Sequence, residues 1–216
     1  MAQSLFDWSW VLDNLGEIWA QLAEHIVLTV VPVGLGFLMA FPMALASIRW
    51  PRLYSPLLGV AGILFSIPTL ALFVVMIPFT GLSKATAIIP LTLYTLLILL
   101  RNTVEGLKGV PSHVREAAEA MGYTRTRQLF RIELPLAVPV IIAGLRIATV
   151  NTIAYVAITA LIGQGGLGNL FMDGFLRQYP TPLIVGLVLS VLLAVAADLG
   201  LLGVQHVLTP WQRDPG

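Results

Sequence analysis

The chain has 216 residues, of which 57% are hydrophobic and 11% are charged, and its formal net charge is +1. Ordinary soluble domains carry about 25% charged residues, so this chain has too little polar surface for a water-soluble globule and is predicted to be an all-α membrane protein. At roughly 20 residues per crossing there is room for five or six membrane helices and no second soluble domain. The small net charge gives no support to nucleic-acid binding, and the absence of cysteine excludes disulfides and thiol ligands.

The N-terminal segment, residues 1–24, is predicted to lie outside the membrane. Between residues 8 and 22 apolar side chains recur at helical spacing with acids on the other side, which predicts a short amphipathic helix on the membrane surface. A flexible tail is the alternative. The segment contains no lysine or arginine, so we expect no secretory signal there. The apolar positions are Trp8, Val11, Leu12, Leu15, Trp19 and Leu22.

Five charge-poor intervals follow, and each is long enough for a transmembrane helix. The second contains Pro68 and is expected to be tilted or kinked there. The third is short, and it spans the membrane if Lys84 and Arg101 at its ends extend to opposite interfaces. Together they make a transmembrane domain over residues 25–208. The predicted spans cover residues 26–48, 57–78, 85–100, 139–162 and 182–206.

The distribution of basic residues predicts the orientation. Nine of the twelve lysines and arginines follow the first, third and fifth spans, which places them on one side of the membrane. Only Lys84 and Arg177 fall on the other side, and Arg146 lies within a span. By the positive-inside rule these nine residues mark the cytoplasmic side, so the N-terminus is expected outside and the tail, residues 209–216, in the cytoplasm. The membrane is expected to be the plasma membrane or inner membrane of the cell.

Two ionisable residues, Arg146 and Asp198, lie within the fourth and fifth spans. An ionisable group in hydrocarbon costs on the order of 3 kcal/mol unless it finds water or a partner. Both lie about two turns from the cytoplasmic ends of their spans, so an ion pair between them is one interpretation. The other is that each side chain extends separately to the interface.

Polar side chains within the second and fourth spans are candidates for a translocation pathway. Asn151, Tyr155 and Thr159 are spaced by four residues and would share one helical stripe. Such a stripe can equally hydrogen-bond a neighbouring helix. The full candidate set is Ser66, Thr69, Asn151, Thr152, Tyr155 and Thr159.

The cytoplasmic loop over residues 101–135 holds ten charged residues. Pro111 breaks the preceding helix, Ser112 is a plausible N-cap, and Gly122 suits a left-handed C-terminal cap, which predicts a helix over 112–121. Thr124 can cap a second helix that ends at Pro135. On the first helix Val114, Ala117, Ala118 and Met121 are predicted to share one face, with Arg115, Glu116 and Glu119 elsewhere. Two short helices joined by glycine suggest a docking surface for a soluble partner, and a solvated loop is the alternative.

The spacing within this loop is specific. Glu116, Ala117 and Ala118 are followed by three residues and Gly122, then by nine residues and Ile132, one residue, and Leu134 with Pro135. This spacing matches the EAA signature, EAA-x3-G-x9-I-x-LP, at every defined position. The chain therefore resembles the permease subunits of binding-protein-dependent ABC importers. Four other segments resemble the osmoprotectant subfamily: SIPTLALFVVMIPFTGL, IIPLTLYTLLILLRNT, IELPLAVPVIIAGLRIATV and LIGQGGLG.

The resemblance implies a methionine-permease-like fold of about five helices and the cargo class of glycine betaine, choline or carnitine. It implies four kinds of partner: ABC ATPase subunits, a second permease, an extracytoplasmic substrate-binding protein and membrane lipid. The EAA loop would be the coupling helix that inserts into the ATPase. Glu116 would make polar contacts, Ala117 and Ala118 would allow close packing, and Gly122 would make the turn. Helix geometry adds Arg115, Glu119 and Met121 as contacts.

No enzyme chemistry is predicted for this chain. The G-x4-GK[ST] phosphate loop is absent, so ATP and Mg²⁺ are expected on the partner ATPase and no cofactor here. GQGGLG, residues 163–168, follows a membrane helix and not a strand, which favours a glycine turn at the external end of span four over nucleotide binding. No catalytic group is predicted. The histidines, His25, His113 and His206, lack the spacing of metal ligands, so no metal site is predicted.

An amino-acid importer and a secondary transporter remain as alternative functions.

Overall fold

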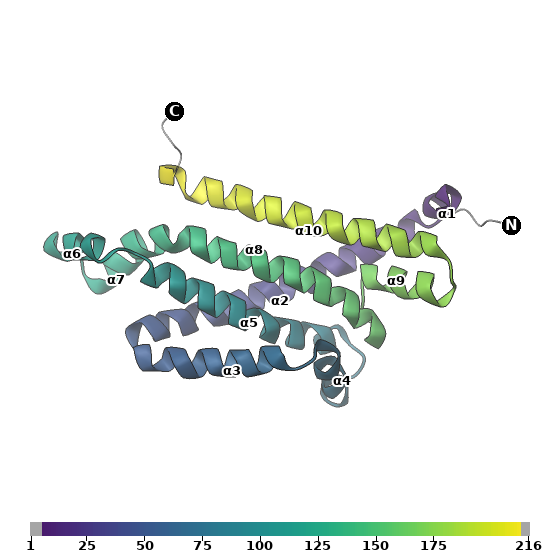
Figure 1. The fold of residues 1–216 in the computed structure, drawn as a ribbon, viewed down its shortest axis with the longest axis horizontal. Helices are drawn as coiled ribbons and strands as arrows, with labels where there is room; N and C mark the ends of the chain where they lie inside the picture. Colours follow the sequence, from purple (N-terminus) through teal and green to yellow (C-terminus); the bar gives the residue numbers. More distant parts are fainter. Residues whose placement is uncertain (1–5, 213–216) are drawn as a thin grey trace.

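The computed structural model describes residues 6–212, and all regular structure in that range is helical (Figure 1). The α-helices are α1 (Trp8–Asp13), α2 (Leu15–Arg49), α3 (Tyr54–Ser66), α4 (Thr69–Thr80), α5 (Lys84–Lys108), α6 (Ser112–Ala120), α7 (Arg125–Gln128), α8 (Leu134–Ile158), α9 (Leu167–Leu176) and α10 (Pro180–Leu208). The shorter elements are η1 (Pro51–Leu53), the π-helical turn η2 (Leu129–Glu133), η3 (Thr159–Ile162) and η4 (Pro210–Gln212).

Within residues 6–212, four long helices are apolar enough to cross a membrane, and a fifth crossing is present if α3 and α4 count as one broken span. The four are α2, α5, the continuous helix from Arg125 to Ile162, and α10. The second predicted span breaks more sharply than a kink, because α3 and α4 meet at 93°. Ile67 at the break is extended, as the residue before a proline prefers to be, and this ends α3.

The core lies where α2, α5 and α8 meet. Small residues on α2 and α8 face larger aliphatic residues on α5, which allows the backbones to approach closely. Gly36 shows how close the approach is, since a Cβ there would lie 1.8 Å from the Thr95 hydroxyl oxygen. The fully buried members of this cluster include Ala40, Ala44, Leu99, Leu100, Val104 and Ala148.

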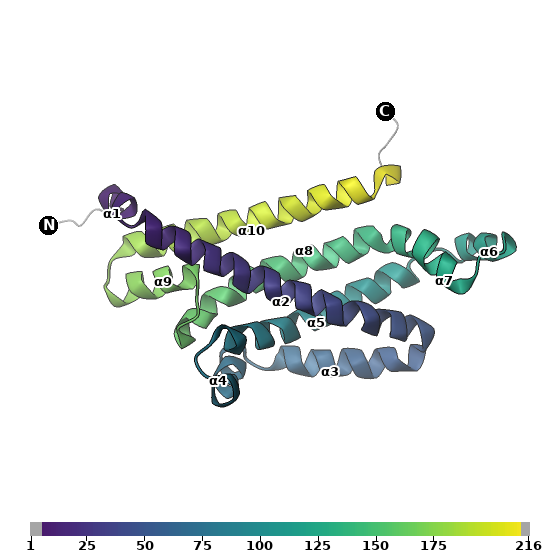
Figure 2. The same cartoon turned by 180° about the vertical axis from the view of Figure 1, so that it is seen from behind.

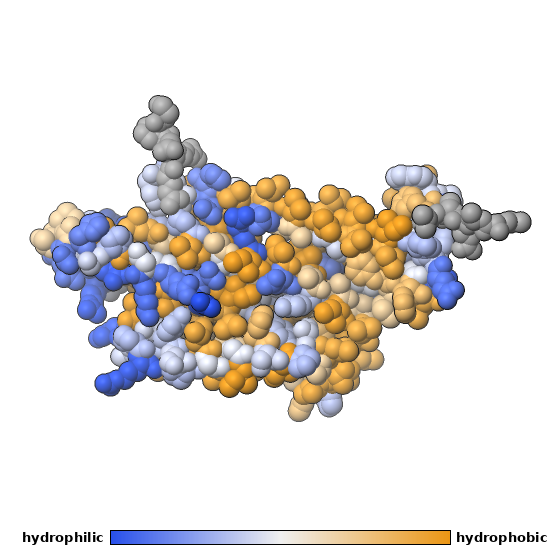
Figure 3. All heavy atoms as spheres, viewed as in Figure 1, coloured by the Kyte–Doolittle hydropathy of each residue, from blue (hydrophilic) through white to orange (hydrophobic). Residues whose placement is uncertain are grey.

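The molecule is elongated, and different short elements occupy its two ends (Figures 1 and 2). One end carries α6, α7 and the turn between α2 and α3, while the other carries α1, α4 and α9. Figure 3 shows hydrophilic residues gathered over the α6–α7 end and apolar residues over most of the middle. Because α10 exposes large apolar residues such as Leu187, Val191 and Leu199, this middle zone suits a lipid environment.

The N-terminal amphipathic helix differs from its predicted extent. Residue 14 ends α1, and residues 15–22 form the first turns of α2, so the predicted helix over 8–22 is two helices. Asp7 caps α1, and Ile18 and Leu22 pack against α9 and α10. Residues 1–5, and residues 213–216 of the predicted tail, lie outside the described range.

Two boundaries of the charged loop also differ from prediction. Pro111, and not Ser112, is the N-cap of α6, and Ser112 is its first residue. Pro135 does not end the second helix; it is the second residue of α8 and follows directly on the π-helical turn η2. The helix runs on through the π-helical turn η2, so one continuous helix joins the loop to the fourth span.

Candidate functional site

The turn after α6 is built on Gly122. Its φ of 78° lies in the left-handed region, and its N–H donates to the Glu119 carbonyl oxygen at 2.9 Å. The Tyr123 N–H donates to the Ala118 carbonyl oxygen at 3.1 Å, and Thr124 Oγ1 accepts from the Arg127 N–H at 3.4 Å to begin α7. The predicted glycine turn and threonine cap are therefore confirmed.

The exposed face of α6 contains most of the predicted ATPase contacts. Glu116, Ala117 and Glu119 are exposed, and Met121 is 67% exposed just beyond the helix end. Ala118 is different, because it is fully buried against its own chain. Val114, Ala117, Ala118 and Met121 lie at helical spacing, but Ala118 packs against the chain while Ala117 and Met121 are exposed, so the four do not form one exposed surface.

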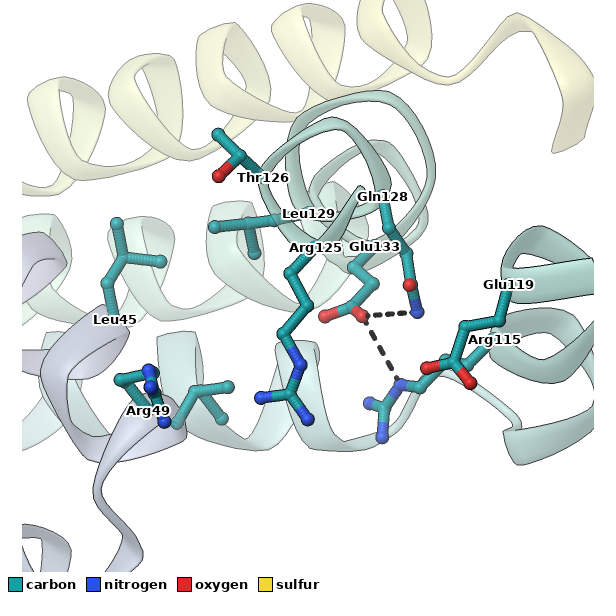
Figure 4. Close-up of a pocket in the computed structure, with 10 residues that line it drawn as sticks. Leu45, Arg49, Arg115, Glu119, Arg125, Thr126, Gln128, Leu129 and Glu133 are labelled. Carbon is teal, nitrogen blue, oxygen red and sulfur yellow. Dashed lines mark hydrogen bonds and ion pairs between the residues drawn. The ribbon is translucent and has the colours of Figure 1, made fainter. Parts of the chain in front are cut away.

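Arg115 points back toward the membrane helices (Figure 4). Its Nη2 donates to the Leu107 carbonyl oxygen at 2.7 Å, and its Nε lies 3.6 Å from Glu133 Oε1. Gln128 is buried and donates to the same Glu133 oxygen at 3.1 Å. Arg115 thus ties α6 to the end of α5 and to η2, and it does not present its guanidinium on the exposed face. The sequence reasoning missed Gln128 and Glu133, which no local pattern marks.

A polar cleft of about 410 Å³ lies beside this network, between the C-terminal end of α2 and helices α6 and α7. Three arginines, Arg49, Arg115 and Arg125, point into it (Figure 4). The remaining lining residues are Leu45, Ile48, Glu119, Thr126, Gln128, Leu129 and Glu133.

Arg146 and Asp198 meet between α8 and α10. Arg146 Nε donates to Asp198 Oδ1 and Nη2 donates to Oδ2, both at 2.7 Å, so the contact is bidentate. The two side chains are 29% and 33% exposed. They line a hollow of about 410 Å³ together with Asn151. The structure thus forms the ion pair and does not extend the two groups separately to the interface.

The pathway candidates do not form a single stripe. Asn151 faces the hollow beside α10, whereas Tyr155 lies against α5, where its ring centroid is 5.6 Å from that of Tyr94. Thr159 and Thr152 are buried and bond carbonyl oxygens of their own helix, those of Val156 and Ala148.

Tyr94 links Tyr155 to the break between α3 and α4. Its hydroxyl donates to the Ile67 carbonyl oxygen, and its ring packs edge-on against Phe65 at 5.8 Å. Ser66 and Thr69 flank the break at Ile67, so this part of the candidate set is brought together through Tyr94. Sequence reasoning missed Tyr94, although a tyrosine within a predicted span, whose hydroxyl needs a partner in hydrocarbon, was a usable signal.

The glycine-rich loop, residues 163–168, folds against His25 of α2. His25 is fully buried; its Nδ1 accepts from the Leu167 N–H at 3.3 Å, so its Nε2 donates to the Ile153 carbonyl oxygen at 3.0 Å. A Cβ on Gly166 would lie 2.7 Å from the His25 backbone nitrogen. The predicted turn is confirmed, and His25, which the sequence left without a role, holds it in place. In the described range no three His, Cys, Asp or Glu residues are placed to hold a metal ion.

The family model described as the binding-protein-dependent transport system inner membrane component matches residues 33–207. The chain belongs to this family. Among curated members it is 37% identical over 206 residues to the osmoprotectant import permease protein OsmW of Salmonella typhimurium, covering 93% of this chain and 96% of that one. It is 35% identical to the choline transport system permease protein OpuBB of Bacillus subtilis, covering 91% of each.

A solved structure of the MetNI methionine ABC transporter in inward-facing conformations has a similar chain, with a TM-score of 0.75 and 25% identity. That match covers 87% of this permease and 94% of the other chain. The expected resemblance and the methionine-permease-like helical fold are therefore confirmed. The permease is a multi-pass membrane protein.

Proposed function

We propose that this permease is the membrane subunit of an ATP-driven importer for osmoprotectants of the glycine betaine, choline or carnitine class. The observation that carries the cargo class is its 37% identity, along nearly its whole length, to a relative named as an osmoprotectant import permease. A second relative, 34% identical over 197 residues, is named for glycine betaine, carnitine and choline transport.

In this proposal a separate ATPase binds the exposed face of α6. Glu116 and Glu119 offer carboxylates to the ATPase, Ala117 permits close approach, and Met121 contributes an exposed apolar contact. ATP hydrolysis is assigned to that subunit because the sequence has no phosphate-binding loop. A binding protein delivers cargo at the opposite end, beside α9, and a second permease completes the pathway.

The orientation follows from the charges. Arg49 ends α2, Arg52 lies in η1, and these elements and the α6–α7 loop with its arginines are at one end of the molecule, which we assign to the cytoplasm. The N-terminus is then outside. Motion of α6 is transmitted by Arg115 to the end of α5 and by the continuous helix from Arg125 to Ile162, which reaches the opposite end of the molecule.

The cargo pathway is assigned to the surface at Tyr155, whose ring packs against the buried Tyr94. A quaternary ammonium group is attracted to aromatic faces by cation–π interaction, and these two rings lie next to the broken span that contains Ser66 and Thr69. An amino-acid importer is the second candidate, favoured by the structural likeness to a methionine transporter.

The test is uptake by the reconstituted importer. The permease is placed in proteoliposomes with the ATPase and binding protein encoded beside it, and ATP-driven uptake of radiolabelled glycine betaine, choline, carnitine and methionine is compared. We expect uptake of at least one quaternary amine and none of methionine. Uptake of methionine alone would replace the osmoprotectant assignment with the amino-acid one.

A further inference from the structure

The cleft between α2, α6 and α7 has an excess of positive charge. Arg115 is neutralised by Glu133 at 3.6 Å, but Arg49 and Arg125 have no carboxylate within 4.0 Å among residues 6–212. The other acid of the cleft, Glu119, lies on the Arg115 side, away from Arg49 (Figure 4). Two unpaired guanidinium groups therefore face one shared space.

The position of Arg49 places this cleft at a membrane surface. Arg49 is the last residue of a 35-residue apolar helix, and its guanidinium lies 5.9 Å from the ring of Trp50, which is 58% exposed. Nearby, Lys108 Nζ lies 4.4 Å from the Tyr54 ring centroid. Aromatic rings beside basic side chains are typical of the headgroup level of a bilayer.

The rest of the lining separates a lipid from a soluble anion. Leu45, Ile48 and Leu129 line the same cleft as the arginines. Leu45 and Ile48 lie within about one turn of Arg49 toward the centre of the membrane helix, where an acyl chain would begin. A free phosphate would make no favourable contact with these apolar side chains, whereas a phospholipid has a phosphate for the arginines and an acyl chain for the apolar residues.

We propose that this cleft binds the phosphate of an anionic phospholipid in the leaflet at the α6–α7 end, with Arg49 and Arg125 on the phosphate and Leu45 and Ile48 along the upper acyl chain. Planar guanidinium groups suit phosphate oxygens because they can donate two parallel hydrogen bonds. A carboxylate of the ATPase is the competing occupant. It is disfavoured because the α6 residues that line the cleft are Arg115 and Glu119, whereas Glu116, Ala117 and Met121 of the exposed face do not line it.

The experiment uses the full chain purified in a non-ionic detergent. Phosphatidylglycerol and phosphatidylcholine with identical acyl chains are titrated, and retained lipid is counted by native mass spectrometry. The wild type is expected to retain phosphatidylglycerol preferentially. Arg49→Gln with Arg125→Gln should weaken that retention about 30-fold, and each single change about 5-fold, which corresponds to about 1 kcal/mol for each lost guanidinium–phosphate contact. The matched control, Arg52→Gln with Arg131→Gln, removes two exposed arginines that do not line the cleft and should change retention less than about 3-fold.

Four results would overturn the proposal. The first is equal retention of both lipids by the wild type. The second is an unchanged preference for phosphatidylglycerol in the double variant and both single variants. The third is inorganic phosphate alone raising the melting temperature of the wild type as much as phosphatidylglycerol does, which would assign the cleft to a free anion. The fourth is loss of the lipid when the ATPase assembles, which would make the cleft a protein contact. None of these readouts depends on transport.

Discussion

Gly122 is the residue on which the shape of the turn between α6 and α7 depends most directly. Its φ is 78°, and no atom lies within 4 Å of the place that a Cβ would occupy. Glycine is therefore needed here for the left-handed backbone conformation and not for its small size. We predict that Gly122→Val costs about 1–2 kcal/mol at the turn, displaces α6 and weakens ATPase binding. Co-purification of the ATPase and ATP-driven uptake measure this. Gly122→Asn is the control, since asparagine tolerates the left-handed region, and equal loss in both variants would contradict the explanation.

Arg146 and Asp198 form the ion pair that joins α8 to α10. We predict that Arg146→Gln and Asp198→Asn each lower the melting temperature of the purified permease, and that the double variant is little worse than either single one. The reason is that each single change leaves one ionised group without its partner in an apolar surrounding. Additive losses in this double-mutant cycle would show that the two groups act independently.

At this scale the sequence located Gly122, Thr124 and the motif from Glu116 to Pro135, because turn chemistry and spacing are local. It did not place Ala118 or Arg115. A helical repeat shows which residues share a face, but the direction of that face depends on contacts with Leu107 and Glu133, which other elements supply.

Among the elements, the glycine-rich loop after η3 shows two different needs for glycine. Gly163 has φ of 76° and open space around it, whereas Gly166 has φ of 48° and would place a Cβ 2.7 Å from His25. We predict that Gly166→Ala destabilises the permease by about 1–3 kcal/mol more than Gly163→Ala, since overpacking adds to backbone strain. Thermal unfolding in detergent compares the two variants. Equal losses in unfolding free energy would mean that the His25 segment moves aside at little cost.

The short helix α1 is fastened to the start of α10 through Asp7. The Ser9 and Tyr179 hydroxyls donate to its carboxylate at 2.6 and 3.0 Å, and these bonds, the Ser9 bond first, lower the pKa of Asp7 below its ordinary value of 3.8. A lowered pKa in the folded state stabilises α1 above pH 3.8, and this contribution is lost as pH falls through the lower folded value.

We therefore predict that α1 detaches as pH falls below about 4. The chain has no cysteine, so an environment-sensitive fluorophore on Leu12→Cys reports α1 alone. Asp7→Asn is the control, because it removes the titrating group and should flatten the fluorescence change. The same pH profile in both proteins would assign the transition to another group.

Two prolines illustrate why element boundaries were only partly predictable. Pro68 was expected to bend a span, and the extended Ile67 before it turns the chain through 93°. Pro135 was expected to end a helix, yet the helix continues past it, with the π-helical turn η2 directly before it. The residue type is the same, and the difference lies in the residue before each proline, since Ile67 is extended whereas Leu134 is helical.

For the whole molecule, the apolar periodicity was enough to locate the long helices, since hydrocarbon requires internally bonded backbones of a set length. It could not give their arrangement around α5, which depends on side-chain fit at positions such as Gly36 and Thr95. The family signature reached further than periodicity, because it identified the family to which the chain belongs.

Transport by the assembled importer depends, in this mechanism, on coupling between the exposed face of α6 and the ATPase. The direct measurement is ATP-driven uptake of the osmoprotectant cargo by proteoliposomes, comparing wild type with Glu116→Lys, and with Arg101→Gln as an exposed control outside the motif. We predict that Glu116→Lys inserts normally but loses at least about 90% of uptake, because charge reversal costs several kcal/mol at a carboxylate contact that docking of the ATPase would bury. Full uptake by Glu116→Lys, or uptake driven by an ion gradient without ATPase, would contradict this mechanism.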